Sequence, residues 1–420
     1  MTILMRTSMS KRVKAPVAVA SREVLSASDF TYLGKHPVDR LIGYNFGGGG
    51  ELNFGQGFTL RYVGGQLRFL TYGFISGTMR LVEFAKPASL GDTITTATNV
   101  WTNITTPSQH HGITWDETDG VLWTTDAIDY PETVPQEQDT KTIATRVLNS
   151  NGTISSYRGL MGLQGINGRR VFGGMCRIPS WFRTAHSLPE FAVGFGGYTS
   201  RLGIGPVSLG PTMYAIPDPR DYSDGAEIPD TDFKVLMDHS SGSGSDDSGS
   251  PTTYDRGRRF NLDYDNEYDG GNWTSPASDL YGRFCWGDDC NNSACWIDND
   301  AGTRTKHGFV LVPTLGTGRL WYEGSTLNYT GKTAEIQIFD PSQFAECAAS
   351  TRNAWNVQPV AGKDLTSDLT GHLAGGNGFL IPGGVAGAAF DPTDSRLYVY
   401  ANDSSADSNS TILVYSVGGA

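Results

Sequence analysis

The chain is poor in charge, and its charge is mostly of one sign. Charged residues make up 18% of the 420 residues, against roughly 25% in ordinary globular proteins. Lysine and arginine number 32 and the acidic residues 44, which gives a formal net charge of −12 at pH 7. Nucleic-acid binding needs a basic face, so this balance argues against a nucleic-acid partner.

Long apolar runs are also missing. No run approaches the ~20 residues that span a bilayer, so we expect no membrane insertion. Lys11, Arg12 and Lys14 interrupt the N-terminal segment, which therefore lacks the continuous apolar core of a signal peptide. We expect a chain that is intracellular or that reaches the outside as part of an assembled particle.

Recognised catalytic motifs are absent too. The sequence has no Gly-x-Ser-x-Gly, His-Glu-x-x-His or phosphate-loop pattern. His110 and His111 stand near Asp116, Glu117 and Asp119, but adjacent residues of a strand face opposite ways and do not readily share one ligand. The sequence therefore leans away from an enzyme.

Glycine and aromatic residues are plentiful, with 53 Gly, 9 Trp, 18 Tyr and 19 Phe. Residues 387–417 read as three short strands joined by an Asp-Pro-Thr-Asp-Ser turn and a polar loop. Three antiparallel strands of this kind make most of a four-stranded propeller blade. The pattern predicts an all-β fold, a single β-propeller.

Similar units recur along the chain and predict six blades, with seven as the alternative if residues 260–273 contribute strands. The predicted blades are residues 57–87, 111–154, 156–197, 206–239, 277–341 and the final unit from residue 387. The short strand at residues 30–34 is expected to pair with the last blade and close the ring. Residues 29–420 then form the propeller, with the Ser/Gly/Asp-rich residues 240–253 as a surface loop.

Residues 1–28 have no periodic pattern and are predicted to be an extended arm. Such an arm is either disordered or docks on a neighbouring subunit, and the sequence leaves both open.

Several short motifs resemble a loosely defined set of propeller-like proteins from bacterial, phage and environmental sequences. The motifs are Tyr32-Leu33-Gly34, Ile178-Pro179-Ser180-Trp181, Phe284-Cys285-Trp286-Gly287, Lys306-His307-Gly308-Phe309, residues 335–341 and residues 387–392. Their order along the chain carries the likeness, which covers most of residues 30–417. The resemblance implies a propeller and no particular chemistry.

Asp263, Asp265, Glu267 and Asp269 alternate along the chain and end in Gly270-Gly271. Calcium prefers six to eight oxygen ligands, so this stretch is a candidate calcium loop, and calcium is the one candidate cofactor. A solvated acidic loop is the alternative, and it is common at this net charge.

Cys285, Cys290 and Cys295 are separated by four residues each. They could bind zinc together with His307, form a disulfide, or remain three separate thiols.

The sequence favours a non-enzymatic structural or binding protein of an extracellular assembly. A phage or virus particle is the leading case, with residues 1–28 as the anchor to other subunits. The propeller would then present a face to glycans or to a host surface. A carboxylate-dependent glycan hydrolase or lyase is one alternative, and a soluble protein-interaction propeller is the other.

Overall fold

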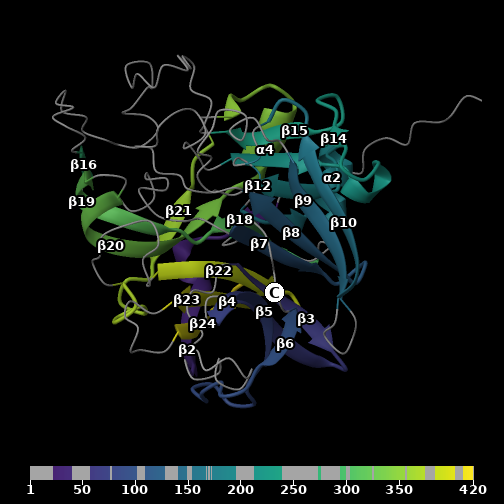
Figure 1. Cartoon of the computed structure of the whole chain (residues 1–420). Helices are drawn as coiled ribbons and strands as arrows, with labels where there is room; N and C mark the ends of the chain where they lie inside the picture. The colour runs from purple at the N-terminus through teal and green to yellow at the C-terminus, as the bar shows by residue number, and fades with distance from the viewer. Residues whose placement is uncertain are drawn as a thin grey trace, which may run out of the picture.

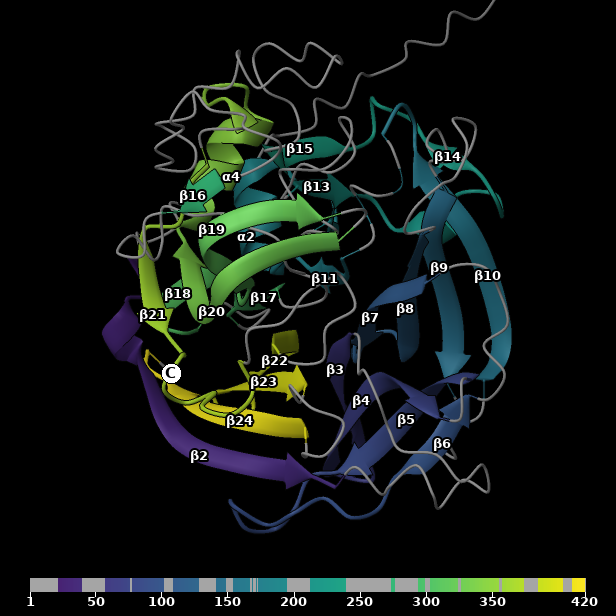
Figure 2. The ribbon, with the colours of Figure 1, turned by 60° about the vertical axis from the view of Figure 1, so that its left-hand side comes forward.

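The computed structural model shows five β-sheets arranged around a common centre (Figures 1 and 2). The structure describes residues 22–39, 57–75, 78–101, 109–127, 141–148, 154–166, 168, 171, 173–194, 212–238, 273–275, 294–298, 303–323, 326–354, 357–373, 384–402 and 410–419.

Each sheet contains one four-stranded blade whose first strand lies nearest the centre. Blade 1 consists of β3 (Phe58–Val63), β4 (Gln66–Ile75), β5 (Thr78–Ala85) and β6 (Thr98–Trp101). Blade 2 consists of β7 (Gln109–Asp116), β8 (Val121–Ala127), β9 (Lys141–Leu148) and β10 (Ile154–Leu163). Blade 3 consists of β11 (Met175–Arg177), β12 (Phe191–Gly194), β13 (Thr212–Ile216) and β15 (Lys234–Asp238).

The two remaining sheets contain blades 4 and 5. Blade 4 consists of β17 (Ala294–Ile297), β18 (Lys306–Leu311), the end of β20 (Thr326–Phe339) and β21 (Ala361–Asp364). Blade 5 consists of β22 (Gly384–Asp391), β23 (Arg396–Asn402), β24 (Ser410–Val417) and β2 (Phe30–Val38).

The remaining elements decorate the blades. β14 (Glu227–Ile228) pairs with β10, and β1 (Glu23–Val24) pairs with β18. β19 (Thr314–Glu323) forms a long hairpin with β20 that projects beside the ring in Figure 1, and β16 (Trp273–Ser275) pairs with it. The helices are η1 (Ala27–Asp29), α2 (Ser180–His186), η5 (Pro219–Asp221) and α4 (Pro341–Ala348). None of the described helices is long and apolar enough to cross a bilayer.

Local sequence explains the blades. The turn between β3 and β4 is Gly64-Gly65, and both glycines have positive φ (58° and 79°). Two-residue hairpin turns with φ > 0 match the twist of the flanking strands, and glycine takes this conformation without strain. The turns after Asp116 and Asp391 instead use a carboxylate that accepts backbone N–H groups two residues on.

The core lies between neighbouring blades. One buried cluster joins Phe69 of blade 1 to Tyr398 of blade 5, and another joins Trp123 of blade 2 to Phe191 of blade 3. The other three clusters join blades 1 and 2, blades 3 and 4, and blades 4 and 5. Burial of these faces is the main stabilising contribution, because apolar area removed from water yields roughly 25 cal/mol per Å².

The inner strands contact one another in cyclic order: β3 contacts β7, β7 contacts β11, β11 contacts β17, β17 contacts β22, and β22 contacts β3. Glycine permits the closest of these approaches. A Cβ atom on Gly387 would lie 2.5 Å from the Phe58 Cβ, and one on Gly112 would lie 2.5 Å from the Gly174 nitrogen. Between blades 1 and 5, the Gly57 N–H also donates to the Ala386 carbonyl at 3.0 Å.

The prediction of six blades is wrong, because the described residues form five. Residues 156–197 were expected to be a blade of their own, but β10 is the outer strand of blade 2. The rest of that segment supplies β11 and β12, which join β13 and β15 in blade 3. β11 has only three residues, and α2 separates it from β12. The sequence pattern therefore did not indicate that these two strands belong to the same sheet as β13 and β15.

The predicted pairing of the first strand with the last blade is present, since Phe30 lies opposite Val417 and Val38 opposite Ser410. Part of the predicted arm belongs to the propeller. Leu25 is 2% exposed, and its N–H donates to the His307 carbonyl at 2.9 Å. Residues 1–21 and 240–253 lie outside the described part of the chain.

We predict that Gly387→Ala lowers the free energy of unfolding by about 1–3 kcal/mol, the usual cost of overpacking. The added methyl would meet the Phe58 nitrogen at 2.7 Å, and backbone cannot move aside as a side chain can. Urea titration monitored by tryptophan fluorescence measures the effect. Gly308→Ala is the matched control, because its methyl would meet the flexible Leu25 side chain at 3.3 Å. Equal losses in the two variants would contradict the argument.

Candidate functional site

A cavity of about 270 Å³ lies on the axis of the ring and receives residues from all five inner strands. Its aromatic lining residues are Phe58, Trp115, Trp123, Phe191, Trp296 and Phe390. Its charged lining residues are Asp116, Glu117, Arg177 and Asp298. An apolar concave surface with a few polar groups is the usual form of a small-molecule site, and this volume is near the lower end of the usual range of roughly 300–1,000 Å³.

Asp116 and Asp391 occupy equivalent places in blades 2 and 5, each as the last residue of an inner strand. Asp116 accepts the Thr118 N–H at 3.0 Å and the Arg177 guanidinium of blade 3 at 2.5 Å. Asp391 accepts the Thr393 N–H at 2.9 Å and the Tyr62 hydroxyl of blade 1 at 2.8 Å. Each carboxylate thus shapes its own turn and holds the next blade.

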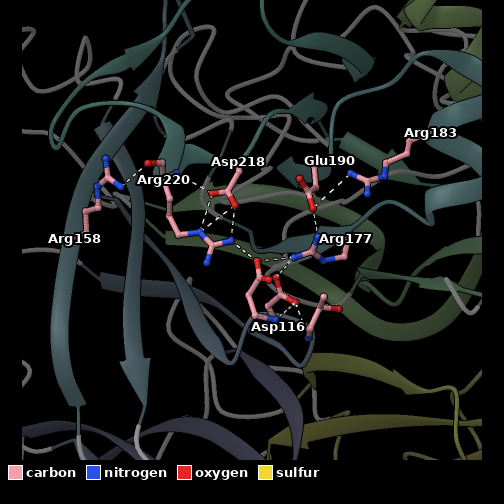
Figure 3. A network of polar contacts seen from close by, with 9 residues as sticks. Asp116, Arg158, Arg177, Arg183, Glu190, Asp218 and Arg220 are labelled. Carbon is pink, nitrogen blue, oxygen red and sulfur yellow. Dashed lines mark hydrogen bonds and ion pairs between the residues drawn. The ribbon is translucent and has the colours of Figure 1, made fainter.

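A network of ion pairs, called the tie below, joins blades 2 and 3 and contains both Arg177 and Arg220 (Figure 3). Arg177 pairs with Asp116, with Asp119 at 2.9 Å and with Glu190, while Arg220 pairs with Asp119 and Asp218. Burial alone would lower the pKa of Arg177, but hydrogen bonding and charge from its carboxylate partners raise it above its ordinary value.

Both guanidinium groups of this tie also stack on rings of the cavity lining. The Arg177 guanidinium lies 4.7 Å from the Phe191 ring centre, and that of Arg220 lies 5.5 Å from the Trp123 ring centre. The two rings contact each other at 5.2 Å between centres. Cation–π contacts of this kind contribute roughly 0.5–2 kcal/mol each, so the tie supports the wall of the cavity as well as the seam between blades.

Trp115 and Glu117 form a second polar group at the cavity, two residues apart on blade 2. The Trp115 indole N–H donates to Glu117 Oε2 at 2.6 Å, and the Tyr62 N–H donates to the same oxygen at 3.3 Å. The Trp115 N–H donates to the Thr59 hydroxyl at 2.9 Å. Glu117 is exposed and Trp115 is half-buried, so this pair is the accessible part of the lining.

Asp298 lies at the end of β17 and takes part in a third contact. It accepts the Arg22 guanidinium at 2.8 Å and the Trp181 indole N–H at 2.9 Å, and the guanidinium stacks 4.0 Å from the Trp181 ring centre. The N-terminal segment therefore reaches a residue of the cavity wall.

Cys176 and Cys295 also line the cavity, and both are free thiols, as is Cys347. Burial raises the pKa of Cys176 well above its ordinary value and that of Cys295 to about 12. The thiolate is the nucleophile and the metal ligand, so these raised pKa values disfavour the reactive form of both thiols.

The structure brings Asp116, Glu117 and Cys295, which the sequence analysis considered, together with Arg177 and Asp298, which it did not. Asp263, Asp265, Glu267 and Asp269 lie outside the described residues, as do Cys285 and Cys290. No group of three or more His, Cys, Asp and Glu side chains in the described part of the chain could hold a metal ion.

A signal for one wall of the site was nevertheless present. The turn sequences Asp116-Glu-Thr-Asp and Asp391-Pro-Thr-Asp repeat one pattern, which places a carboxylate at the end of an inner strand twice. Arg177 carries no comparable signal, because its partners stand 13 to 61 positions away in the sequence.

Comparison with known proteins finds no matching family model and no matching curated protein. Among solved structures, the chain is similar to a DUF4221 family member from Bacteroides vulgatus, with 8% identity and a TM-score of 0.35 over 93% of this chain and 98% of that one. A protein from Lactobacillus plantarum matches with 8% identity and a TM-score of 0.29, over 87% and 86% of the two chains. Saccharomyces cerevisiae Sqt1 matches with 11% identity and a TM-score of 0.25, over 93% and 88%.

We predict that Asp119 contributes stability that is lost in acid. Hydrogen bonding from Arg220 is the largest cause that lowers the pKa of Asp119 below its ordinary 3.8. The unfolded chain therefore binds this proton at higher pH than the folded protein does, and the contribution is present above about pH 4 and lost as the pH falls through the folded pKa.

Asp119→Asn should lower the free energy of unfolding at pH 7 by at most about 1 kcal/mol, because the side chain is partly exposed. The difference from the wild type should shrink by pH 3, as measured by thermal unfolding at both pH values. Asp230→Asn, at an exposed position on the turn before β15, is the control. A difference that stays constant with pH would contradict the assignment.

Proposed function

We propose that this protein is a non-enzymatic binding protein, a closed five-bladed propeller that holds a ligand in its axial cavity. One observation carries the proposal: all five inner strands contribute to a single cavity that combines aromatic rings with carboxylates. Carbohydrates suit such a lining, because their C–H faces stack on rings and their hydroxyl groups donate to carboxylates. A glycan is therefore the class of ligand we propose.

Hydrolysis of a glycan is the second candidate, because three acidic side chains line the cavity. A glycosidase needs one protonated carboxylic acid and one free carboxylate or activated water across the bond to be cleaved. Asp116 and Asp298 each accept a guanidinium group, which occupies carboxylate oxygens that a substrate would otherwise contact. Glu117 is the lining carboxylate with no ion pair among the described residues, and one free carboxylate favours binding over hydrolysis.

We predict that Thr118→Trp reduces glycan binding at least tenfold on a printed glycan array. Thr118 is exposed and lines the cavity at the turn after β7, so an indole placed there covers the opening with little cost to the core. Thr231→Trp is the matched control, since Thr231 is exposed on blade 3 and is not a lining residue. A silent array for the wild type would overturn the glycan proposal, and release of reducing sugar would replace it with hydrolysis.

We further propose that the protein acts as part of an extracellular assembly, with a phage or virus particle as the leading case. The support is the position of the N-terminal segment. Arg22 and Leu25 dock on blade 4, which fixes the start of the described chain on the propeller, and we propose the residues before it as the anchor to another subunit.

The assembly proposal predicts a fixed ratio of this protein to the other components of purified particles, measured by quantitative mass spectrometry. It also predicts that residues 1–21 resist protease in the intact particle and are cleaved in the isolated protein. A protein recovered only in free form, with these residues cut equally fast in both preparations, would contradict it.

A further inference from the structure

We infer that Trp115 and Glu117 form a subsite for an uncharged pyranose ring, with the Trp115 ring as the stacking platform and Glu117 Oε1 as the acceptor for its hydroxyl groups. The inference rests on the proposed function and names the residues and the ligand chemistry at one wall of the cavity. Both residues line the cavity: Trp115 lies near the end of β7, and Glu117 lies in the turn that follows it.

Contacts on several sides hold the platform in place. The Trp115 backbone N–H donates to Thr59 and its indole N–H to Glu117. The Arg61 guanidinium lies 5.5 Å from the Trp115 ring centre, and Arg61 is not a lining residue, so it covers the ring from outside the cavity. A platform fixed before the ligand arrives loses little conformational entropy on binding.

Arg61 is itself fixed by a buried partner. Its Nε donates to Glu83 at 2.7 Å, and the two side chains are 2% and 6% exposed. A buried pair of this kind resists rearrangement, because removing either partner leaves an uncompensated charge. Arg61 is therefore a positioning residue that acts through Trp115.

The Glu117 carboxylate has one oxygen that can accept a hydrogen bond from a ligand hydroxyl group. Both described donors to Glu117, the Trp115 indole N–H and the Tyr62 N–H, reach Oε2. Oε1 receives no hydrogen bond from the described residues. A hydroxyl group that donates to a charged oxygen forms a stronger hydrogen bond than one that donates to a neutral oxygen, so Oε1 is suited to orient a sugar hydroxyl beside the ring.

The charges near the subsite select against other ligand classes. Asp116, Glu117 and Asp298 line the cavity, and Arg177, the one cationic lining residue, is taken up by three carboxylates. An acidic sugar would meet uncompensated negative charge. A simple cation gains little from a ring that already contacts the Arg61 guanidinium, and an exposed ion pair with Glu117 adds little to binding because solvent screens it.

The test is saturation-transfer NMR and isothermal titration calorimetry with methyl glycosides of glucose, galactose and mannose, N-acetylneuraminic acid and choline. We expect at least one neutral glycoside to bind, with saturation transfer strongest at its ring C–H protons, and neither charged probe to bind more tightly. Trp115→Ala should raise the Kd at least tenfold, Trp115→Phe less, and Glu117→Gln about fivefold. Glu346→Gln is the control, because Glu346 lies on α4, pairs with Arg352 and does not line the cavity. This variant should leave the Kd unchanged.

The outcomes separate the subsite from the proposed function. Binding of a neutral glycoside that Thr118→Trp abolishes, but that Trp115→Ala and Glu117→Gln leave unchanged, overturns the subsite and keeps the cavity as a binding site. Tighter binding of choline or N-acetylneuraminic acid likewise overturns the uncharged pyranose alone. No binding of any probe, together with a silent glycan array, overturns both.

Discussion

The contact between neighbouring inner strands is the constraint on which the rest of the structure depends. At two of the five seams, the inner strands lie closer together than side chains ordinarily permit. Gly112 faces Gly174, and Gly387 faces Phe58, at distances that exclude a Cβ atom. These contacts set the spacing of blades 2 and 3 and of blades 5 and 1, and a buried cluster packs between the blades at every seam.

The same geometry decides where polar groups can lie. An inner strand has a neighbouring blade on each side, so a carboxylate at its end can reach a donor from the next blade. Asp116 reaches Arg177, and Asp391 reaches Tyr62. Burial, and after it the hydrogen bond to Asp391, raises the pKa of Tyr62 to about 12. A hydrogen bond to a charged group contributes roughly 1.5–3 kcal/mol to stability, more than one between neutral groups. The carboxylates at the ends of the inner strands, which form the rim of the cavity, therefore stabilise the contacts between blades.

Much of the fold could be predicted from the sequence, and most of the site could not. Alternation and turn residues predict the strands of blade 5, and the need to cover a free edge predicts residues 30–34 as the partner of the last strand. In the structure that partner, β2, extends to Val38. The blade count failed where strands are short, because β11 has three residues and no period of its own. The site failed for a different reason: its members come from five blades, and residues such as Arg177 and Asp298 are informative only beside partners that are distant in the sequence.

A cavity built by five blades is also rigid, and this bears on what it can do. Most of its lining residues lie on inner strands packed between blades, and the seam between blades 2 and 3 is held by Arg177 and Arg220 with four carboxylates. A fixed wall lowers the cost of binding a ligand of matching shape. Catalysis asks in addition for groups that exchange protons during the reaction, and two of the three lining carboxylates, Asp116 and Asp298, are instead held by guanidinium groups. Rigidity combined with paired charge is thus the physical reason to favour a binding function for this cavity.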